Sequence, residues 1–229
     1  MFLEDAEGAD GLIILGKCNR KVLEEVKSYC KNIIGINRNA VNYGIDEAVC
    51  NGQSIASIAV KHLISLGHKK IGYVGVCHDE ERFLGFQKTL FEYNITPNID
   101  YIYDTNAGFV EGQNAIKYFL SQADPPSALY CANDIIAIGI LSYLNKHKKR
   151  HYNPSVVSSD DIHEAQYTKP ILTTVSLPKE EMVKFALMIL NDKIRNGHKS
   201  VIRMEFEGKL IIRESTGKPD TAFDCEYYI

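Results

Sequence analysis

Short apolar runs alternate along this chain with longer segments of helical periodicity. The apolar runs are rich in Val, Ile, Leu and Tyr, which is typical of buried strands. The predicted strands are 11–15, 33–36, 70–76, 101–103, 128–131 and 156–158. Between them, the predicted helices are 20–31, 53–66, 80–93, 109–122, 134–147 and 179–196. This alternation predicts an α/β protein whose parallel sheets are covered by helices.

The pattern changes toward the carboxyl terminus. Residues 171–177 favour an extended segment that ends at Pro178, a residue suited to the first turn of a helix. After that helix, 201–207 and 209–213 form two β-type segments on either side of Gly208. They predict a hairpin or a strand interrupted by a bulge.

Length, charge and cysteine usage narrow the class of protein. A chain of 229 residues can bury one large core or two small lobes, and both arrangements fit. The net charge is −3, so the chain has no excess of positive charge to attract nucleic acid, and we do not expect this chain alone to bind DNA. The six cysteines show no metal-ligand spacing, which favours reduced thiols. With no apolar run of membrane-spanning length and an acidic start, we expect a soluble, cytoplasmic protein.

Two successive predicted strands end in polar pairs. Asn133 and Asp134 follow one strand, and Asp160 and Asp161 follow the next. Ligands of α/β proteins bind at the carboxyl ends of parallel strands, so these pairs indicate a site for a polar small molecule. Helix capping by the first pair and a turn at the second explain the same residues equally well. The repetition of the pattern favours a binding site.

Two further residues are candidates for that site. Arg82 lies in the first turn of a predicted helix, where a cation is unfavourable. Either the three neighbouring acids neutralise it, or its guanidinium donates a forked set of hydrogen bonds to a polyol or carboxylate. Phe109 begins another helix and can stack on a sugar face, although an aromatic residue there also suits a core.

Catalytic and metal-binding motifs are missing from the sequence. We find no GxSxG, GxxxxGK[ST] or HExxH pattern and no GxGxxG after a strand. We therefore expect no enzyme activity, no metal and no cofactor. His68 lies in a connection between a helix and a strand, where structural hydrogen bonding explains it.

An ordered set of segments resembles the effector-binding core of the LacI/GalR family of bacterial transcription regulators. The segments are Asp10-Gly11-Leu12-Ile13-Ile14, residues 59–75, Glu81-Arg82-Phe83-Leu84-Gly85-Phe86, residues 132–139, Asp160-Asp161-Ile162 and residues 170–175. The resemblance covers about residues 10 to 216. Within the family, the chain is most similar to sugar-responsive members of the evolved β-galactosidase repressor type.

The resemblance implies two Rossmann-like lobes with parallel sheets, the type I periplasmic binding protein-like fold, with an effector bound between them. The N-terminal lobe would comprise 1–67 and 174–200, and the C-terminal lobe 68–173 and 201–216, followed by a tail at 217–229. No helix-turn-helix head and no opening strand-helix units precede residue 10, so we expect the N-terminal lobe to be incomplete.

The resemblance also assigns roles. Arg82, Asn133 and Asp160 match effector-contacting residues of the family, and the effector would be a carbohydrate. Cys50-Asn51 stands where family members often carry Asp-Asn, which is a departure. A full-length homodimer would bind operator DNA through a head domain absent from this chain.

Two alternatives remain at this point. A solute-binding protein of a sugar transporter shares the fold, and the missing secretory signal argues against it. An enzyme acting on a sugar or nucleotide would rest only on the carboxylates of Asp134, Asp160 and Asp161.

Overall fold

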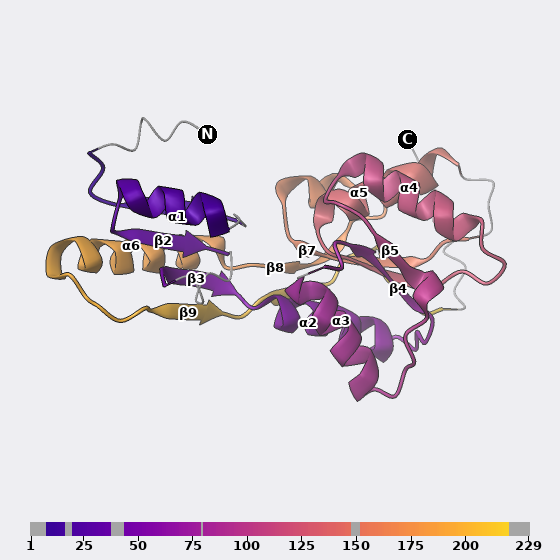
Figure 1. Ribbon diagram of the computed structural model, residues 1–229. Coiled ribbons are helices and arrows are strands. Elements are labelled where there is room, and N and C mark those ends of the chain that lie inside the picture. The colour runs from indigo at the N-terminus through magenta and orange to yellow at the C-terminus, as the bar shows by residue number, and fades with distance from the viewer. Residues whose placement is uncertain (1–7, 17–19, 38–43, 79, 148–151, 220–229) are drawn as a thin grey trace. The chain divides into compact units, whose positions relative to one another are not determined.

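The computed structural model describes residues 8–16, 20–37, 44–78, 80–147 and 152–219 (Figure 1). The chain divides into two compact units. Unit 1 comprises Met1–Asn51 and Pro178–Glu207, and unit 2 comprises Gly52–Leu177 and Gly208–Ile229. The chain therefore passes from one unit to the other at three points.

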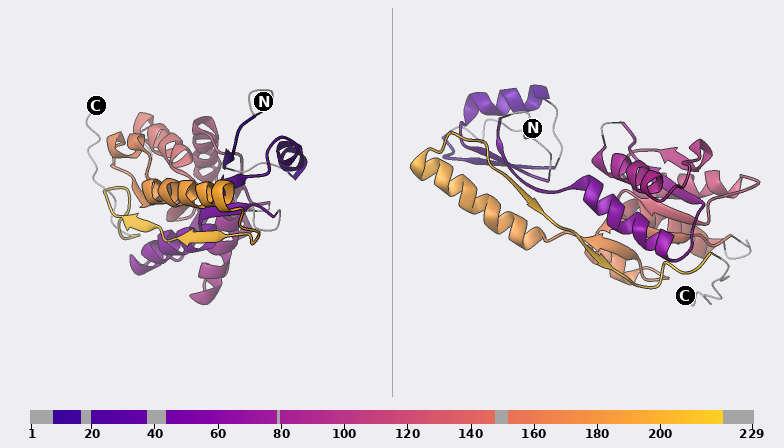
Figure 2. Two further views of the ribbon diagram at one scale, coloured as in Figure 1. Left: turned by 90° about the vertical axis from the view of Figure 1, so that its left-hand side faces the viewer. Right: turned by 90° about the horizontal axis from the view of Figure 1, so that it is seen from below.

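Unit 1 is built on a four-stranded parallel sheet in the order β1-β2-β3-β9. Its strands are β1 (Leu12–Leu15), β2 (Ile33–Ile36), β3 (Asp46–Cys50) and β9 (Arg203–Phe206). Helices α1 (Arg20–Tyr29) and α6 (Lys179–Asn196) lie on opposite sides of the strands (Figure 2). Helix α1 buries Leu23 and Val26 against the sheet, as the apolar periodicity of this segment predicts.

Unit 2 is built on a six-stranded sheet in the order β10-β8-β7-β6-β4-β5, parallel except for β10. The strands are β4 (Ile71–Gly75), β5 (Ile102–Asp104), β6 (Ala128–Cys131), β7 (Ser155–Asp160), β8 (Thr173–Ser176) and β10 (Lys209–Ile211). The helices are α2 (Gly52–Ser65), α3 (Glu81–Glu92), α4 (Phe109–Leu120) and α5 (Asp134–Lys146). Helices α2 and α3 cover one face and α4 and α5 the other (Figure 1).

The helix pairs of unit 2 cross at glycines. A Cβ atom on Gly85 of α3 would lie 2.5 Å from backbone atoms of Gln53 in α2. A Cβ atom on Gly139 of α5 would lie 2.1 Å from the carbonyl oxygen of Phe109 in α4. These close approaches require glycine, and they fix the amino-terminal ends of α3 and α4, which carry Arg82 and Phe109.

Strand β3 was not predicted from the sequence. Its first two residues, Asp46 and Glu47, are acidic, and such residues are depleted in strands. Both are fully buried because cations from distant segments neutralise them: Lys193 donates to Asp46 over 2.7 Å, and Arg203 pairs with Glu47. No local pattern reveals these partners, since they lie about 150 residues away in the sequence.

The predicted hairpin about Gly208 is wrong. Strand β9 pairs in parallel with β3 in unit 1, whereas β10 pairs antiparallel with β8 in unit 2. The two segments therefore belong to different sheets, and the expected assignment of 201–207 to the C-terminal lobe is corrected.

The expected boundary after residue 67 also moves, because α2 packs against α3 and therefore belongs to unit 2. Residues 174–177 belong to unit 2 as well, since β8 lies in its sheet.

The cysteines in the described part of the chain form no disulfide with one another. Cys18 and Cys225 lie outside the described residues. Burial, followed by the nearby Asp104 carboxylate, raises the pKa of the Cys77 thiol to about 12, which keeps it protonated. Within the described ranges, no helix combines the length and the apolar character needed to cross a membrane.

Candidate functional site

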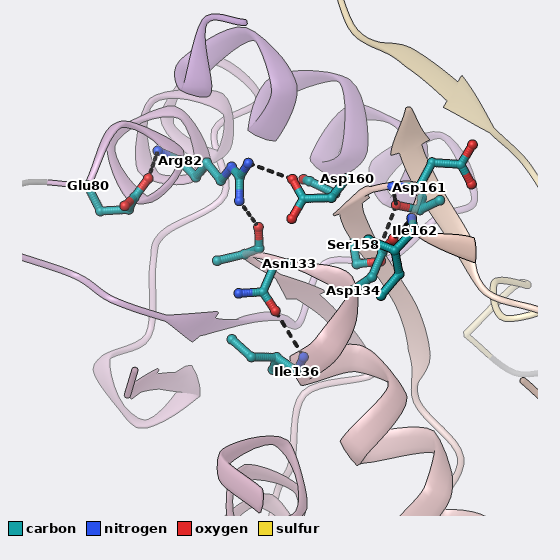
Figure 3. Close-up of polar contacts among 12 residues, drawn as sticks. Glu80, Arg82, Asn133, Asp134, Ile136, Ser158, Asp160, Asp161 and Ile162 are labelled. Atoms are coloured by element: carbon teal, nitrogen blue, oxygen red, sulfur yellow. Dashed lines mark hydrogen bonds and ion pairs between the residues drawn. The ribbon is translucent and has the colours of Figure 1, made fainter. Parts of the chain in front are cut away.

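The Arg82 guanidinium joins the ends of two neighbouring strands in unit 2 (Figure 3). Its Nη2 atom donates to Oδ1 of Asp160, the last residue of β7, over 2.8 Å. Its Nη1 atom donates to the carbonyl oxygen of Ala132, directly after β6, over 2.5 Å. Glu80 caps α3 by accepting from the Arg82 backbone N–H over 3.3 Å. The sequence left two kinds of partner open for Arg82, the neighbouring acids or a ligand. In the structure, Arg82 instead pairs with a carboxylate that is distant in the sequence.

The pair between Arg82 and Asp160 is largely withdrawn from solvent. The exposed fraction is 16% for the Arg82 side chain and 25% for that of Asp160. Burial alone would lower the pKa of Arg82, but the charge of Asp160, with those of other neighbours, outweighs it and raises that pKa. Arg82 therefore remains charged and forked toward the strand ends.

The two aspartates after β7 have different partners. Asp160 pairs with Arg82, whereas Oδ1 of Asp161 accepts from Arg213 Nη2 over 2.7 Å. Asp160 has φ +117° and Asp161 has φ +47°, and residues other than glycine rarely adopt such positive backbone angles. A strained turn of this kind is typical of functional sites and requires support from its surroundings.

Asn133 is the amino-terminal cap of α5. Its Oδ1 accepts from the backbone N–H of Ile136 over 3.0 Å, so the capping interpretation is confirmed. Its Nδ2 atom points away from Ile136 (Figure 3) and donates to none of the residues that the structure describes. The amide can therefore cap the helix with its oxygen and still offer a donor to a ligand.

Asp134 does not cap α5 but accepts three hydrogen bonds from buried groups around it. Its side chain is fully buried, and its Oδ2 accepts from the Ile162 backbone N–H over 2.8 Å. Its Oδ1 accepts from Ser158 Oγ and from Thr174 Oγ1. Burial raises the pKa of Asp134, while these hydrogen bonds oppose the rise. The sequence indicated that Asp134 could cap α5, and the structure corrects this because Asn133 occupies the cap.

Two buried tyrosines next to Arg82 were missed by sequence reasoning. Tyr73 and Tyr130 are fully buried, and their ring centroids lie 5.9 Å apart. The Tyr130 hydroxyl exchanges a hydrogen bond with Ser159 Oγ over 3.0 Å. The pKa of Tyr130 is raised by burial, an effect that the neighbouring Arg82 charge opposes. In the sequence these residues are indistinguishable from ordinary β-strand tyrosines.

Phe109 and His68 are separate from this group. Phe109 is the first residue of α4 and 40% exposed, and no aromatic contact links its ring to another ring in the described part of the chain. Its role as a sugar-stacking residue remains a prediction. His68 is buried, with its Nε2 atom 2.8 Å from the Gly217 carbonyl oxygen and its Nδ1 atom 2.8 Å from Ser127 Oγ. These contacts confirm a structural role for His68.

The described residues contain no group of three His, Cys, Asp or Glu side chains arranged to hold a metal ion. Instead, a forked cation, a carboxylate and an amide donor meet at the carboxyl-terminal edge of a parallel sheet. Fold and site together define an α/β ligand-binding domain of two sheet-based units.

Comparison with known proteins gives the family. The family model described as periplasmic binding protein-like domain matches residues 60–216. The chain belongs to this family, in the form that serves as the effector-binding domain of LacI-type transcriptional regulators, a class of binding domains and not of enzymes. The order of motifs in the sequence had indicated this family.

Individual relatives agree with the family. The HTH-type transcriptional repressor PurR of Aliivibrio salmonicida is 32% identical over 178 residues, which cover 76% of this chain and 54% of that protein. A sugar-binding LacI-family regulator from Escherichia coli, solved with phosphate, is 26% identical with a TM-score of 0.76 and covers 94% of this chain and 80% of that one. A regulator named CelR, solved with cellobiose, has a TM-score of 0.81 at 21% identity and covers 91% of this chain and 66% of that one. The chain spans about half the length of the curated relatives it matches.

Proposed function

We propose that this chain is the sugar-sensing part of a LacI-type repressor, and that Arg82, Asn133 and Asp160 bind the sugar. The observation that carries the proposal is the hydrogen-bonded pair between Arg82 and Asp160 at the carboxyl ends of β6 and β7. A guanidinium beside a carboxylate offers adjacent donors and acceptors. Neighbouring hydroxyl groups of a sugar both donate and accept, so they complement this arrangement.

Two observations support a carbohydrate as the ligand class. The Nδ2 atom of Asn133 adds a neutral donor close to the charged pair, which suits a neutral polyol better than a simple anion. Among the similar structures, one is a sugar-binding regulator and another is a regulator in complex with cellobiose. Phe109 is proposed to pack on the apolar face of the ring. The evolved β-galactosidase repressor type remains a prediction from the sequence, because the curated relatives carry the name PurR.

The proposed output is a change in DNA binding. A sugar that binds one arrangement of the protein more tightly than another shifts the population toward that arrangement. In the full-length protein, a homodimer working in the cytoplasm would transmit this shift to paired heads on operator DNA. A transporter's solute-binding protein would share the fold, but the curated relatives are transcriptional repressors, which favours the regulator.

Isothermal titration calorimetry with cellobiose and a panel of monosaccharides tests the ligand class. At least one sugar should bind, and Asp160→Asn and Arg82→Lys should each weaken binding by about tenfold or more, because hydrogen bonds to charged groups contribute about 1.5–3 kcal/mol. Asp124→Asn is the matched control, since Asp124 forms an exposed ion pair with Lys70. The proposal is wrong if no sugar binds, or if Asp160→Asn and Asp124→Asn bind equally well. Binding of a different compound that Asp160→Asn weakens would keep the site and reject the sugar.

A further inference from the structure

A buried polar network lies against the turn that presents Asp160. Its centre is Asp134, whose Oδ1 accepts from Ser158 Oγ before the turn and whose Oδ2 accepts from the Ile162 N–H after it (Figure 3). Thr174 Oγ1 on the neighbouring strand β8 donates to the same carboxylate over 2.6 Å. Thr174 Oγ1 also accepts from the Asp161 N–H over 3.4 Å. One carboxylate therefore connects both ends of the turn and the adjacent strand.

The network encloses the part of the backbone that needs support. Asp160 and Asp161 both have positive φ, and the strained turn persists only where surrounding contacts hold it. Asp134, Ser158 and Thr174 are all fully buried, so water does not compete for their hydrogen bonds. Breaking one of these hydrogen bonds would leave a buried carboxylate or hydroxyl without a partner. This costs free energy, so the network opposes a local change in the conformation of the turn.

We propose that Asp134 is a positioning residue. Through Ser158, Thr174 and the Ile162 N–H, it holds the turn in the conformation that directs the Asp160 carboxylate at Arg82 before any ligand arrives. The effect on ligand affinity rests on the proposed function, whereas the effect on the turn does not. Such pre-organisation would increase affinity, because the ligand would not have to order the turn on binding.

The chemistry of the network suggests graded variants. Thr174→Val keeps the shape of the side chain but removes the donor to Asp134 and the acceptor for the Asp161 N–H. Asp134→Leu removes the acceptor of all three hydrogen bonds. Asp134→Asn is the conservative variant, because a rotated amide can accept from the Ile162 N–H and donate to both hydroxyls. Ser159→Ala is the matched control, since its buried hydroxyl bonds Tyr130 outside the network.

Hydrogen exchange on the full chain tests the positioning of the turn directly. The reporters are the amides of Asp161 and Ile162, which donate into the network. Thr174→Val and Asp134→Leu should speed exchange in the segment 158–163 by tenfold or more, and Asp134→Asn by less. Ser159→Ala should leave the exchange of that segment unchanged. The inference is overturned if Thr174→Val exchanges there like the unmodified chain, or if Ser159→Ala accelerates exchange equally. Thr174→Val decides the question even where Asp134→Leu does not fold.

Calorimetry with the sugar that binds best in the panel, cellobiose included, tests the consequence for the ligand. Thr174→Val should weaken binding by about tenfold, Asp134→Asn should restore most of the affinity lost in Asp134→Leu, and Ser159→Ala should bind like the unmodified chain. If exchange accelerates in Thr174→Val while sugar affinity stays the same, the turn does not set affinity and the proposed effect of Asp134 on ligand binding is wrong. If the unmodified chain binds no sugar, the proposed function fails, and the exchange data still decide whether Asp134 positions the turn.

Discussion

The Arg82 guanidinium and the Asp160 carboxylate are 78 residues apart in sequence and 2.8 Å apart in the structure. The contact forms because Arg82 lies in the first turn of α3, the helix after β4, and Asp160 ends β7, so both lie at the same edge of the unit 2 sheet. The sequence indicated these two residues independently. Arg82 was an unfavourable cation in the first turn of a helix, and Asp160 was a polar residue at the end of a strand. The pair is the centre of the proposed site.

A double-mutant cycle should measure this contact. Arg82→Met and Asp160→Asn should each destabilise the fold, and the double variant should lose less than the sum of the two. Because both side chains are mostly buried, we expect a coupling free energy of about 1.5 kcal/mol from urea unfolding. The corresponding cycle for Lys70 and Asp124, an exposed pair, should give a clearly smaller coupling, because solvent screens exposed charges. Equal couplings in the two cycles would contradict the assignment of Arg82 and Asp160 as a structured pair.

The glycine crossing of α2 and α3 gives a second prediction. Gly85→Ala would place a Cβ atom 2.5 Å from the Gln53 backbone, so the helices must separate and the first turn of α3 must shift. Overpacking of this kind costs about 1–3 kcal/mol of unfolding free energy. Lys88→Ala on the exposed side of the same helix should change the unfolding free energy by less than about 0.5 kcal/mol. Urea unfolding of both variants checks this, and equal stability of the two would show that α2 and α3 do not cross this closely.

His198 predicts how the stability of unit 1 depends on pH. Its ring nitrogens face two carboxylates, Asp192 over 2.8 Å and Asp46 over 3.0 Å, with Lys193 on the same Asp46 oxygen. Burial and the charge of Lys193 oppose protonation, but the two carboxylates outweigh them and raise the pKa of His198 above its ordinary 6.5. A raised folded-state pKa contributes stability that is fully present below 6.5 and is lost as the pH rises through the folded value.

Unfolding free energies measured between pH 6 and 9 test this expectation. The unmodified chain should lose stability as the pH rises through that range, and His198→Asn should remove this part of the slope. His62 is the contrasting case, because burial and then the neighbouring His68 lower its pKa. His62→Asn should therefore remove a loss of stability that occurs as the pH falls below 6.5. An unchanged slope in His198→Asn would show that the imidazole is not held between two carboxylates.

We expect the unfolding free energy to depend strongly on Arg203, the partner of buried Glu47. Arg203 pairs with Glu47 across β3 and β9, and the Glu47 side chain is fully buried. Arg203→Met should cost about 3 kcal/mol of unfolding free energy, because it leaves a buried carboxylate without its cation. Adding Glu47→Gln to Arg203→Met should recover part of that loss. Chemical unfolding of the single and double variants checks the prediction, and a single variant as stable as the double would contradict it.

The sequence predicted the elements whose side-chain pattern is local. Apolar runs and helical periodicity located β1, β2, β6 and the helices to within two residues at each end, because burial of one face dictates those patterns. Strand β3 escaped because its acids are compatible with burial only through Lys193, His198 and Arg203. The separation of β9 and β10 into different sheets also depends on pairings with distant strands.

The candidate site was predictable to a similar degree. Strand endings indicated the pairs at 133–134 and 160–161, since the carboxyl ends of parallel strands meet at one edge. The resemblance to the LacI/GalR family then selected Arg82, Asn133 and Asp160. The supporting residues Ser158, Thr174 and Arg213 could not be found, because a buried hydroxyl or a paired cation in a strand gives no local signal. Asp134 was visible, but its partners were not.

The structure of this chain with a bound sugar tests the central claim most directly. Crystals grown with cellobiose, or with whichever sugar binds in calorimetry, should show ligand hydroxyls within hydrogen-bond distance of the Arg82 guanidinium, the Asp160 carboxylate and Asn133 Nδ2. A sugar bound elsewhere, with Arg82 still donating only to Asp160 and Ala132, would contradict the assignment of this strand edge as the sensing site.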